Sequence, residues 1–283
     1  MRRAHLHREI AAALGAMAPA RPELWAEVAH HATGAVPVTG PGPAVEPLTR
    51  AAMHAISVNA HELAHQLVEQ RLATIVALPP GRERDEAELL AQTDLCAVLP
   101  ITAGWHTEAL RDAGERVVVL AQRLGDLDAE MRGLSSLSAQ TTVAGRYDRT
   151  VQDLSPRQQA VVARTGDPTH AFIASHGIAM VHLFQGRLVE AERAYLRSEE
   201  QLRIADPDDA GTLRIPPDRM AGVAHHAGLW STLLWMVGDV EGSRRQLERA
   251  HAVASRDGHL QTVWAVWLSH LITSYCDQDP EDV

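Results

Sequence analysis

The sequence predicts an all-α fold, a right-handed superhelix of about five tetratricopeptide-like helical hairpins, and a recurring glycine is the main reason. It occurs at Gly104, Gly145 and Gly186, twice at a spacing of 41 residues, and returns at Gly238 after 52 residues. A fixed period in this range is typical of stacked supersecondary units. Hydrophobic residues make up 46% of the chain and aromatic residues only 4%, which suits closely packed helices with small side chains better than a sheet.

A second glycine-containing motif follows the first by about twenty residues. It reads RLGD at 123–126, RTGD at 164–167 and RDGH at 256–259. One helix-length segment lies between each pair of motifs, so the repeating unit is predicted to be a pair of helices.

Apolar residues at helical spacing, interrupted by proline and glycine, predict the individual helices. The expected helices span 5–18, 24–33, 45–58, 60–77, 85–99, 105–124, 127–143, 147–164, 170–185, 188–204, 217–237, 240–254 and 259–275. Four prolines and three glycines between positions 34 and 47 predict a loop or linker there, and 205–217 reads as an inserted loop. The expected domains are an N-terminal helical segment with a Pro/Gly linker (1–43), the repeat domain (44–276) and an acidic tail (277–283).

The fourth hairpin has the residue pattern that is expected of each unit. Gly186 is expected to end its first helix in the left-handed conformation, Ala191 to allow close helix approach, and Tyr195 to fill the space above. Asn59 stands where later units place the turn glycine. Pro156 falls inside the predicted helix 147–164 and should kink or split it.

Composition and charge restrict the possible functions. The formal net charge is −10 and every basic residue is arginine, which argues against direct contact with nucleic acid and against catalysis by a lysine. No apolar run is long enough for a membrane span, and no signal-peptide pattern opens the chain, so a cytoplasmic location is expected. No cofactor is expected.

The chain resembles the helical repeat region of large bacterial signal-transduction ATPases, including LuxR-type ATP-dependent regulators, antibiotic-regulatory proteins and cyclase-linked ATPases. The resemblance lies in the segments 7–14 (HREIAAAL), 24–32 (LWAEVAHHA), 59–84, 123–126 and 216–270. It implies a non-enzymatic sensor and interaction array that works beside a nucleotide switch and a DNA-binding or cyclase module. Neither a P-loop with its lysine nor a helix-turn-helix pattern occurs in this sequence.

A binding groove is predicted on the first helices of the hairpins, which line the concave surface of such an array. Its Met, aromatic and His residues suit a protein or peptide partner, or a small apolar ligand. An arginine at one end could receive a carboxylate. The predicted groove residues are Arg132, His176, Met180, Phe184, His225, Thr232 and Trp235.

The alternative is a zinc-dependent hydrolase, because residues 61–65 read H-E-x-x-H. On a helix His61 and His65 lie one turn apart and could bind zinc, with Glu62 as general base and Glu86 or Glu88 as third ligand. No downstream motif marks that third ligand. Ala64 occupies the small-residue packing position, so packing of a helical hairpin is the preferred interpretation and no metal is expected.

Two adjacent histidine pairs, 30–31 and 225–226, are not expected to bind metal, because neighbouring helical residues point to different faces. The last helix has no following partner. Its Trp264, Trp267, Leu268 and Leu271 would need a cover, which a homodimer through this helix could supply.

Overall fold

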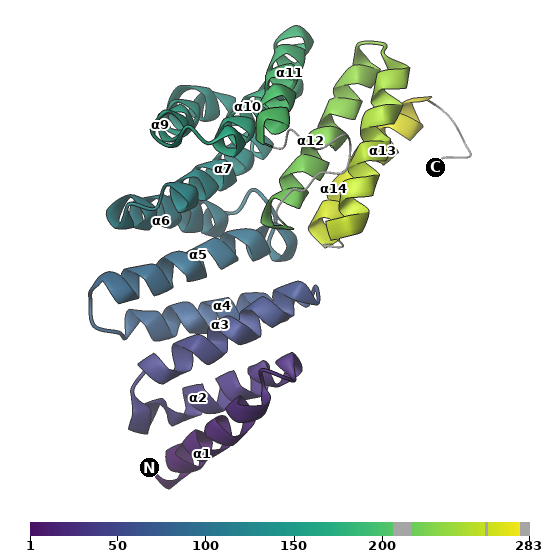
Figure 1. Cartoon of the computed structure of the whole chain (residues 1–283). Coiled ribbons are helices and arrows are strands. Elements are labelled where there is room, and N and C mark those ends of the chain that lie inside the picture. Colours follow the sequence, from purple (N-terminus) through teal and green to yellow (C-terminus); the bar gives the residue numbers. More distant parts are fainter. Residues whose placement is uncertain (206–216, 258–259, 278–283) are drawn as a thin grey trace. The chain divides into compact units, whose positions relative to one another are not determined.

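The computed structural model describes residues 1–205, 217–257 and 260–277, and every regular element among them is helical (Figure 1). The all-α prediction is confirmed at this level. The chain forms two compact units, Met1–Gln140 and Thr141–Val283, whose boundary falls within helix α7 (Leu127–Val143). The sequence did not predict this division.

The N-terminal unit consists of successive helical hairpins. The hairpins are formed by α1 with α2, α3 with α4, and α5 with α6. Neighbouring hairpins are in contact, because α2 packs on α3 and α4 packs on α5. The bounds are α1 (Arg2–Met17), a short 3₁₀ turn η1 (Pro22–Leu24), α2 (Trp25–Thr39), α3 (Gly42–Ser57), α4 (His61–Val76), α5 (Arg82–Thr102) and α6 (Glu108–Leu124), followed by α7.

The linker expected at 34–47 is wrong. Helix α2 continues through Gly34 and Pro37 to Thr39, and α3 begins at Gly42 after a break of two residues. Alanines of α2 share one buried core with residues of α3 and α4, including Ala44 and Leu48. Burial of this apolar face stabilises helix in a stretch that local propensity disfavours, so residues 1–43 are not separated from the hairpins that follow.

The turn glycines adopt the conformation that the repeat predicts. Gly104, Gly145, Gly186 and Gly238 have φ values between 71° and 94°, and Asn59 is the only non-glycine residue with positive φ in the described chain, at 57°. The amide of Gly186 donates to the carbonyl oxygen of Leu183 at 3.0 Å. The backbone amide of Arg187 donates to the carbonyl oxygen of His182 at 2.9 Å. The two hydrogen bonds together form a Schellman cap.

The C-terminal unit begins with an interrupted helix. A turn at α8 (Tyr147–Arg149) passes into a π-helical turn, η2 (Thr150–Leu154), and then into α9 (Ser155–Thr165), with Pro156 in its first turn. The prediction that Pro156 kinks or splits this helix is confirmed only in part, since the helix is distorted by a π-helical turn but not broken. The remaining helices are α10 (Pro168–Phe184), α11 (Leu188–Ala205), α12 (Pro217–Met236), α13 (Val240–Asp257) and α14 (Leu260–Asp277).

In this unit α10 pairs with α11 and α12 with α13, while α14 packs on both α12 and α13. The last helix therefore does have partners within the chain. Trp267, Leu268 and Leu271 nevertheless remain exposed. The side chain of Trp264, the expected loop 206–216, residues 258–259 of the last RDGH motif and the acidic tail 278–283 lie outside the described part.

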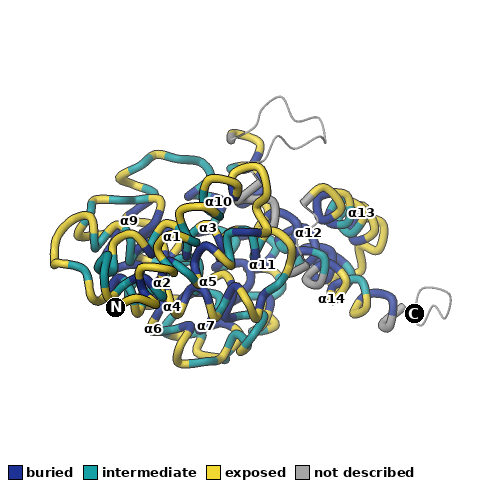
Figure 2. Tube along the Cα trace, turned by 90° about the horizontal axis from the view of Figure 1, so that it is seen from below, coloured by how far each residue is buried: buried dark blue, intermediate teal, exposed yellow. Residues whose placement is uncertain are grey.

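Small residues dominate the interior, as the composition predicts. Ala191 and Tyr195 of α11 are fully buried, as the repeat pattern expects, and the Tyr195 ring stacks on Trp230 at 6.1 Å. Figure 2 shows buried and exposed positions alternating along the helices. No helix in the described residues is both long enough and apolar enough for a membrane crossing.

Candidate functional site

The predicted groove residues of the C-terminal unit lie on two helices that contact each other. His176, Met180 and Phe184 belong to α10, and His225, Thr232 and Trp235 belong to α12. The rings of His176 and His225 meet edge to face, with centroids 5.4 Å apart. Arg132 is exposed on α7, in the N-terminal unit.

These residues differ in exposure. Met180 and Thr232 are buried, and the Thr232 hydroxyl donates to the carbonyl oxygen of Gly228 within its own helix at 3.3 Å. Both therefore lie beneath the surface that a ligand would meet. Phe184 is 45% exposed, and His176, His225 and Trp235 are partly exposed.

His176 and His225 belong to a chain of polar contacts inside the unit. Nε2 of His176 lies 3.4 Å from Nδ1 of His225, and Nδ1 of His176 lies 3.3 Å from Nδ1 of His226. On the other side of the His226 ring, Nε2 lies 3.0 Å from Oε1 of Glu199. Arg249 of α13 donates to the same carboxylate oxygen at 2.8 Å.

One set of tautomers satisfies the whole chain. A carboxylate only accepts, so His226 carries its proton on Nε2, and its Nδ1 accepts from Nδ1–H of His176. Nε2 of His176 then accepts from Nδ1–H of His225. In this arrangement His225 is the outer member of three neutral rings.

Desolvation favours the neutral form of these imidazoles. Desolvation lowers the pKa of His225 to about 4, and nearby His226 adds to the effect. Desolvation and the same neighbour lower the pKa of His176 well below its ordinary value. Burial also lowers the pKa of His226, although Glu199 opposes it. Burial acts to raise the pKa of the Glu199 carboxyl, but contacts with His226 and Arg249 outweigh it, so the pKa is lowered.

Aromatic rings enclose this chain of contacts. Phe172 stacks on His176 with ring centroids 6.2 Å apart, and Trp230 meets His226 edge to face at 5.7 Å. Two buried polar atoms in this layer, Oη of Tyr195 and Nε1 of Trp230, have no hydrogen-bond partner in the described part of the chain. Buried donors are normally satisfied by protein, water or ligand.

An open groove of the N-terminal unit lies between α3 and α5, the first helices of two successive hairpins. Its volume is about 520 Å³, and its lining residues are Gly42, Val45, Glu46, Thr49, Arg50, Met53, Ala87 and Leu90. Met53 is 52% exposed and Leu90 is 48% exposed. The sequence-based prediction did not include this groove, because it placed the groove residues only on later hairpins. The turn residues Asn59 and Gly104 mark α3 and α5 as first helices too.

The H-E-x-x-H histidines of α4 have different surroundings. His61 is buried, whereas Glu62 is exposed. The two ring nitrogens of His65 face protein groups: Nδ1 lies 3.2 Å from the Thr102 hydroxyl, and Nε2 lies 3.6 Å from Oε1 of Glu69. Neither histidine belongs to a group of three potential metal ligands in the described residues.

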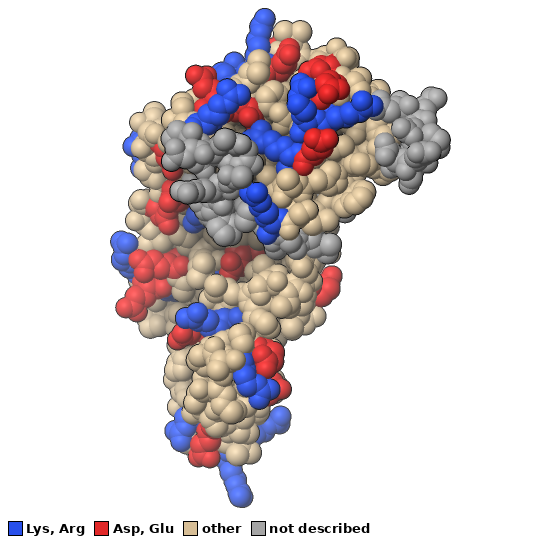
Figure 3. Space-filling model, turned by 45° about the vertical axis from the view of Figure 1, so that its right-hand side comes forward, with Lys and Arg blue, Asp and Glu red and all other residues tan. Residues whose placement is uncertain are grey.

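On the face shown in Figure 3, arginine and acidic side chains are interspersed rather than separated by sign.

Comparison with known proteins found no protein-family model that matches this chain and no matching curated protein.

Proposed function

We propose that this chain is a non-enzymatic binding scaffold, a right-handed superhelix of tetratricopeptide-like hairpins whose first-helix surface holds a peptide segment of a protein partner. The observation that supports this proposal is the groove between α3 and α5, where Met53 and Leu90 remain half exposed. Large apolar side chains grouped in a groove are typical of interaction sites.

A peptide fits this groove better than a small apolar ligand. Small-molecule sites usually enclose most of the ligand surface, whereas this groove is open. From Gly42 to Met53 it follows α3 for about 16 Å at 1.5 Å per residue. Oε1 of Glu46 and Nη2 of Arg50 lie 3.6 Å apart on the wall of the groove, so both signs of charge are present beside the apolar anchors. The expected partner segment is therefore amphipathic, with two or more apolar anchors.

Binding would act through the packing of neighbouring hairpins. Because α4 packs on α5, a peptide that spans α3 and α5 contacts two successive hairpins and favours one packing of them over others. An attached module could respond to that bias. The resemblance to signal-transduction ATPases suggests a transcriptional regulator as the setting. A P-loop coding sequence beside the DNA encoding this chain would support that setting, and unrelated genes on both sides would count against it.

The direct test is selection of peptides from a displayed random library on the purified chain. Val119, on the second helix α6, is 46% exposed and provides a control matched to Met53 and Leu90. Selected peptides should bind the wild type and V119E equally, and M53E and L90E at least about tenfold more weakly, since one buried apolar anchor is worth that much. Peptides that bind all four proteins equally, or no selected peptide at all, would contradict the proposal.

The exposed face of α14 suggests self-association as an additional property, through Trp267, Leu268 and Leu271. Sedimentation equilibrium of the wild type and of L271E tests it: a dimer that L271E converts to monomer supports the contact, and a monomeric wild type rules it out.

A further inference from the structure

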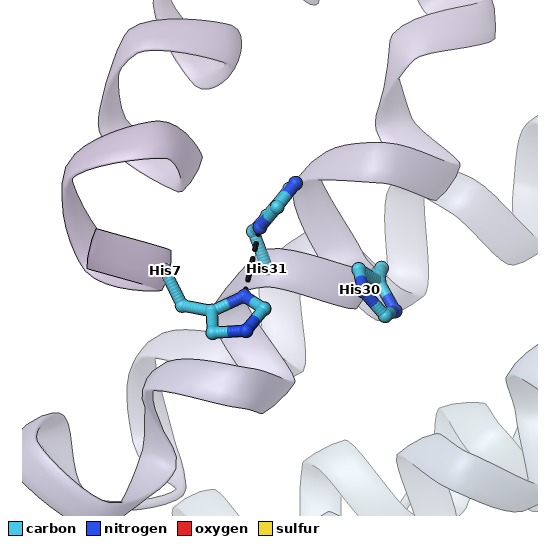
Figure 4. A group of neighbouring side chains, drawn as sticks. All are labelled: His7, His30 and His31. Carbon is cyan, nitrogen blue, oxygen red and sulfur yellow. Dashed lines mark hydrogen bonds between the residues drawn. The ribbon is translucent and has the colours of Figure 1, made fainter. Parts of the chain in front are cut away.

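Three histidines meet between the first two helices of the chain. His7 lies on α1, and His30 and His31 lie on α2 (Figure 4). One ring nitrogen of each can be chosen so that all three atoms lie within 4.8 Å of one another. Nδ1 of His7 and Nδ1 of His31 are 2.8 Å apart. The rings of His30 and His31 are also neighbours, with centroids 5.1 Å apart, although the residues are adjacent on one helix.

A missing side chain on α2 lets the His7 ring approach. A Cβ atom at Gly34 would lie 2.8 Å from Cγ and from Nδ1 of His7, closer than real contacts allow. Gly34 follows His30 by four residues and His31 by three, so it shares their side of the helix. Glycine weakens the interior of a helix, and here it allows the third imidazole to reach the other two.

We propose that His7, His30 and His31 bind a divalent transition-metal ion, Zn²⁺ in the first instance, which joins α1 to α2. Neutral imidazole nitrogens are preferred ligands of Zn²⁺, with Zn–N distances near 2.0–2.1 Å. Tetrahedral geometry then places ligand nitrogens roughly 3.3 Å apart. The nitrogens of His7 and His31 must separate slightly and that of His30 must move closer, which rotation of partly exposed side chains allows.

The surroundings suit a metal with one position open to water. His7 and His31 are partly buried and His30 is exposed, so the fourth coordination position faces solvent. Zn²⁺ accepts three histidines and one water in this way. The ion would also replace the single hydrogen bond between Nδ1 of His7 and Nδ1 of His31. This inference is independent of the peptide groove, because the site lies on α1 and α2 and the groove on α3 and α5.

The chain offers matched variants for the test. H7A and H31A each remove one proposed ligand. H5A removes an exposed histidine of the same helix that is not part of the cluster. G34A removes no ligand, but its methyl group displaces the His7 ring while favouring helix. G34A therefore separates metal binding from folding.

Zn²⁺ titration of the chelator-treated full chain, in competition with a chromophoric chelator, measures binding. We expect about one equivalent bound at this site by the wild type and by H5A. Affinity should fall about tenfold or more in H7A, H31A and G34A, because even loss of an outer-shell contact commonly weakens metal binding that much. Zn²⁺ should raise the unfolding temperature of the wild type but not of H7A. Co²⁺ should give tetrahedral absorption in the wild type and in H5A, but not in H7A or H31A.

Two results would overturn the proposal. One is a wild-type chain that binds no stoichiometric Zn²⁺. The other is stoichiometric binding that H7A and H31A leave unchanged, which would assign the ion to other histidines, such as His251 and His270 with ring nitrogens 3.2 Å apart.

Discussion

Nε2 of His226 lies 3.0 Å from Oε1 of Glu199, and both side chains are buried in the C-terminal unit. This contact joins α12 to α11, and Arg249 brings in α13 through the same carboxylate oxygen. His176 extends the chain of contacts to α10. A single carboxylate therefore links two successive hairpins by polar contacts, in an interior that is otherwise mostly apolar.

Replacing that carboxylate should destabilise the unit. In Glu199→Gln, the side chain keeps its size but loses the charge that Arg249 and His226 contact. We expect the free energy of unfolding to fall by about 1.5–3 kcal/mol, the usual value of hydrogen bonds to a charged group. Urea unfolding followed by circular dichroism measures it. Glu200→Gln, at the exposed neighbouring position, should change stability by less than about 0.5 kcal/mol. Equal effects at the two positions would contradict this role.

Acidification should destabilise the same unit. Unfolded histidines bind protons as the pH falls below 6.5, whereas burial keeps folded His225 neutral down to about pH 4. Since the unfolded state then binds more protons, the full stability is present above pH 6.5 and decreases between pH 6.5 and 4. Each unit of pKa difference is worth about 1.4 kcal/mol. Urea unfolding followed by tryptophan fluorescence should show that the midpoint falls between pH 6.5 and 4. The fall should be smaller in His225→Asn than in the wild type, and the same as in the wild type in His5→Asn. Stability that is constant or rises on acidification would disprove the prediction.

Much of the helical architecture could be predicted from local signals. The turn glycines fix where hairpins bend, because a left-handed residue ends a helix whatever surrounds it. Gly186 and Gly238, and Asn59 in place of glycine, all have the positive φ that the repeat implies. The linker at 34–47 was predicted wrongly for the opposite reason. Its prolines and glycines signal a break locally, but burial against α3 and α4 keeps α2 helical.

The equivalence of Asn59 and Gly186 has a measurable consequence. Asn59 adopts φ 57°, where asparagine is tolerated but glycine is free of strain. Asn59→Gly should therefore lower the free energy of unfolding by less than Gly186→Ala does. Gly186→Ala should lower it by about 1–3 kcal/mol, although nothing obstructs the added methyl group within 4 Å, because an alanine at φ 71° is strained. Thermal unfolding of both variants tests the pair. A loss at Asn59→Gly as large as that at Gly186→Ala would argue against equivalent turns.

The histidine clusters could not be predicted to the same extent. Adjacent helical residues point in different directions, so the sequence did not predict that His30 and His31 belong to one cluster. The sequence does not reveal that α1 delivers His7 to them, or that Gly34 makes room for its ring. The chain from His225 to Glu199 likewise depends on the packing of α10, α11 and α12. Such contacts between distant residues become visible only with the tertiary structure.

The buried pair of Arg71 and Asp94 should respond differently to removal of each partner. Nη1 of Arg71 donates to Oδ2 of Asp94 at 2.8 Å, but Nε and Nη2 of Arg71 have no hydrogen-bond partner in the described residues. Burial lowers the pKa of Arg71 and raises that of Asp94, so desolvation outweighs the attraction between them.

Asp94→Ala should leave the Arg71 charge buried without its partner, and should lower the free energy of unfolding by about 3–5 kcal/mol. Arg71→Met fills a similar volume without a charge and lets Asp94, whose side chain is 18% exposed, reach water. Its effect should range from neutral to stabilising. Urea unfolding measures both, with Arg82→Met as a control at the exposed pair with Glu86, where a change below about 0.5 kcal/mol is expected. Equal losses for Asp94→Ala and Arg71→Met would contradict this prediction, because removing the Arg71 charge would then destabilise the fold as much as leaving it unpaired.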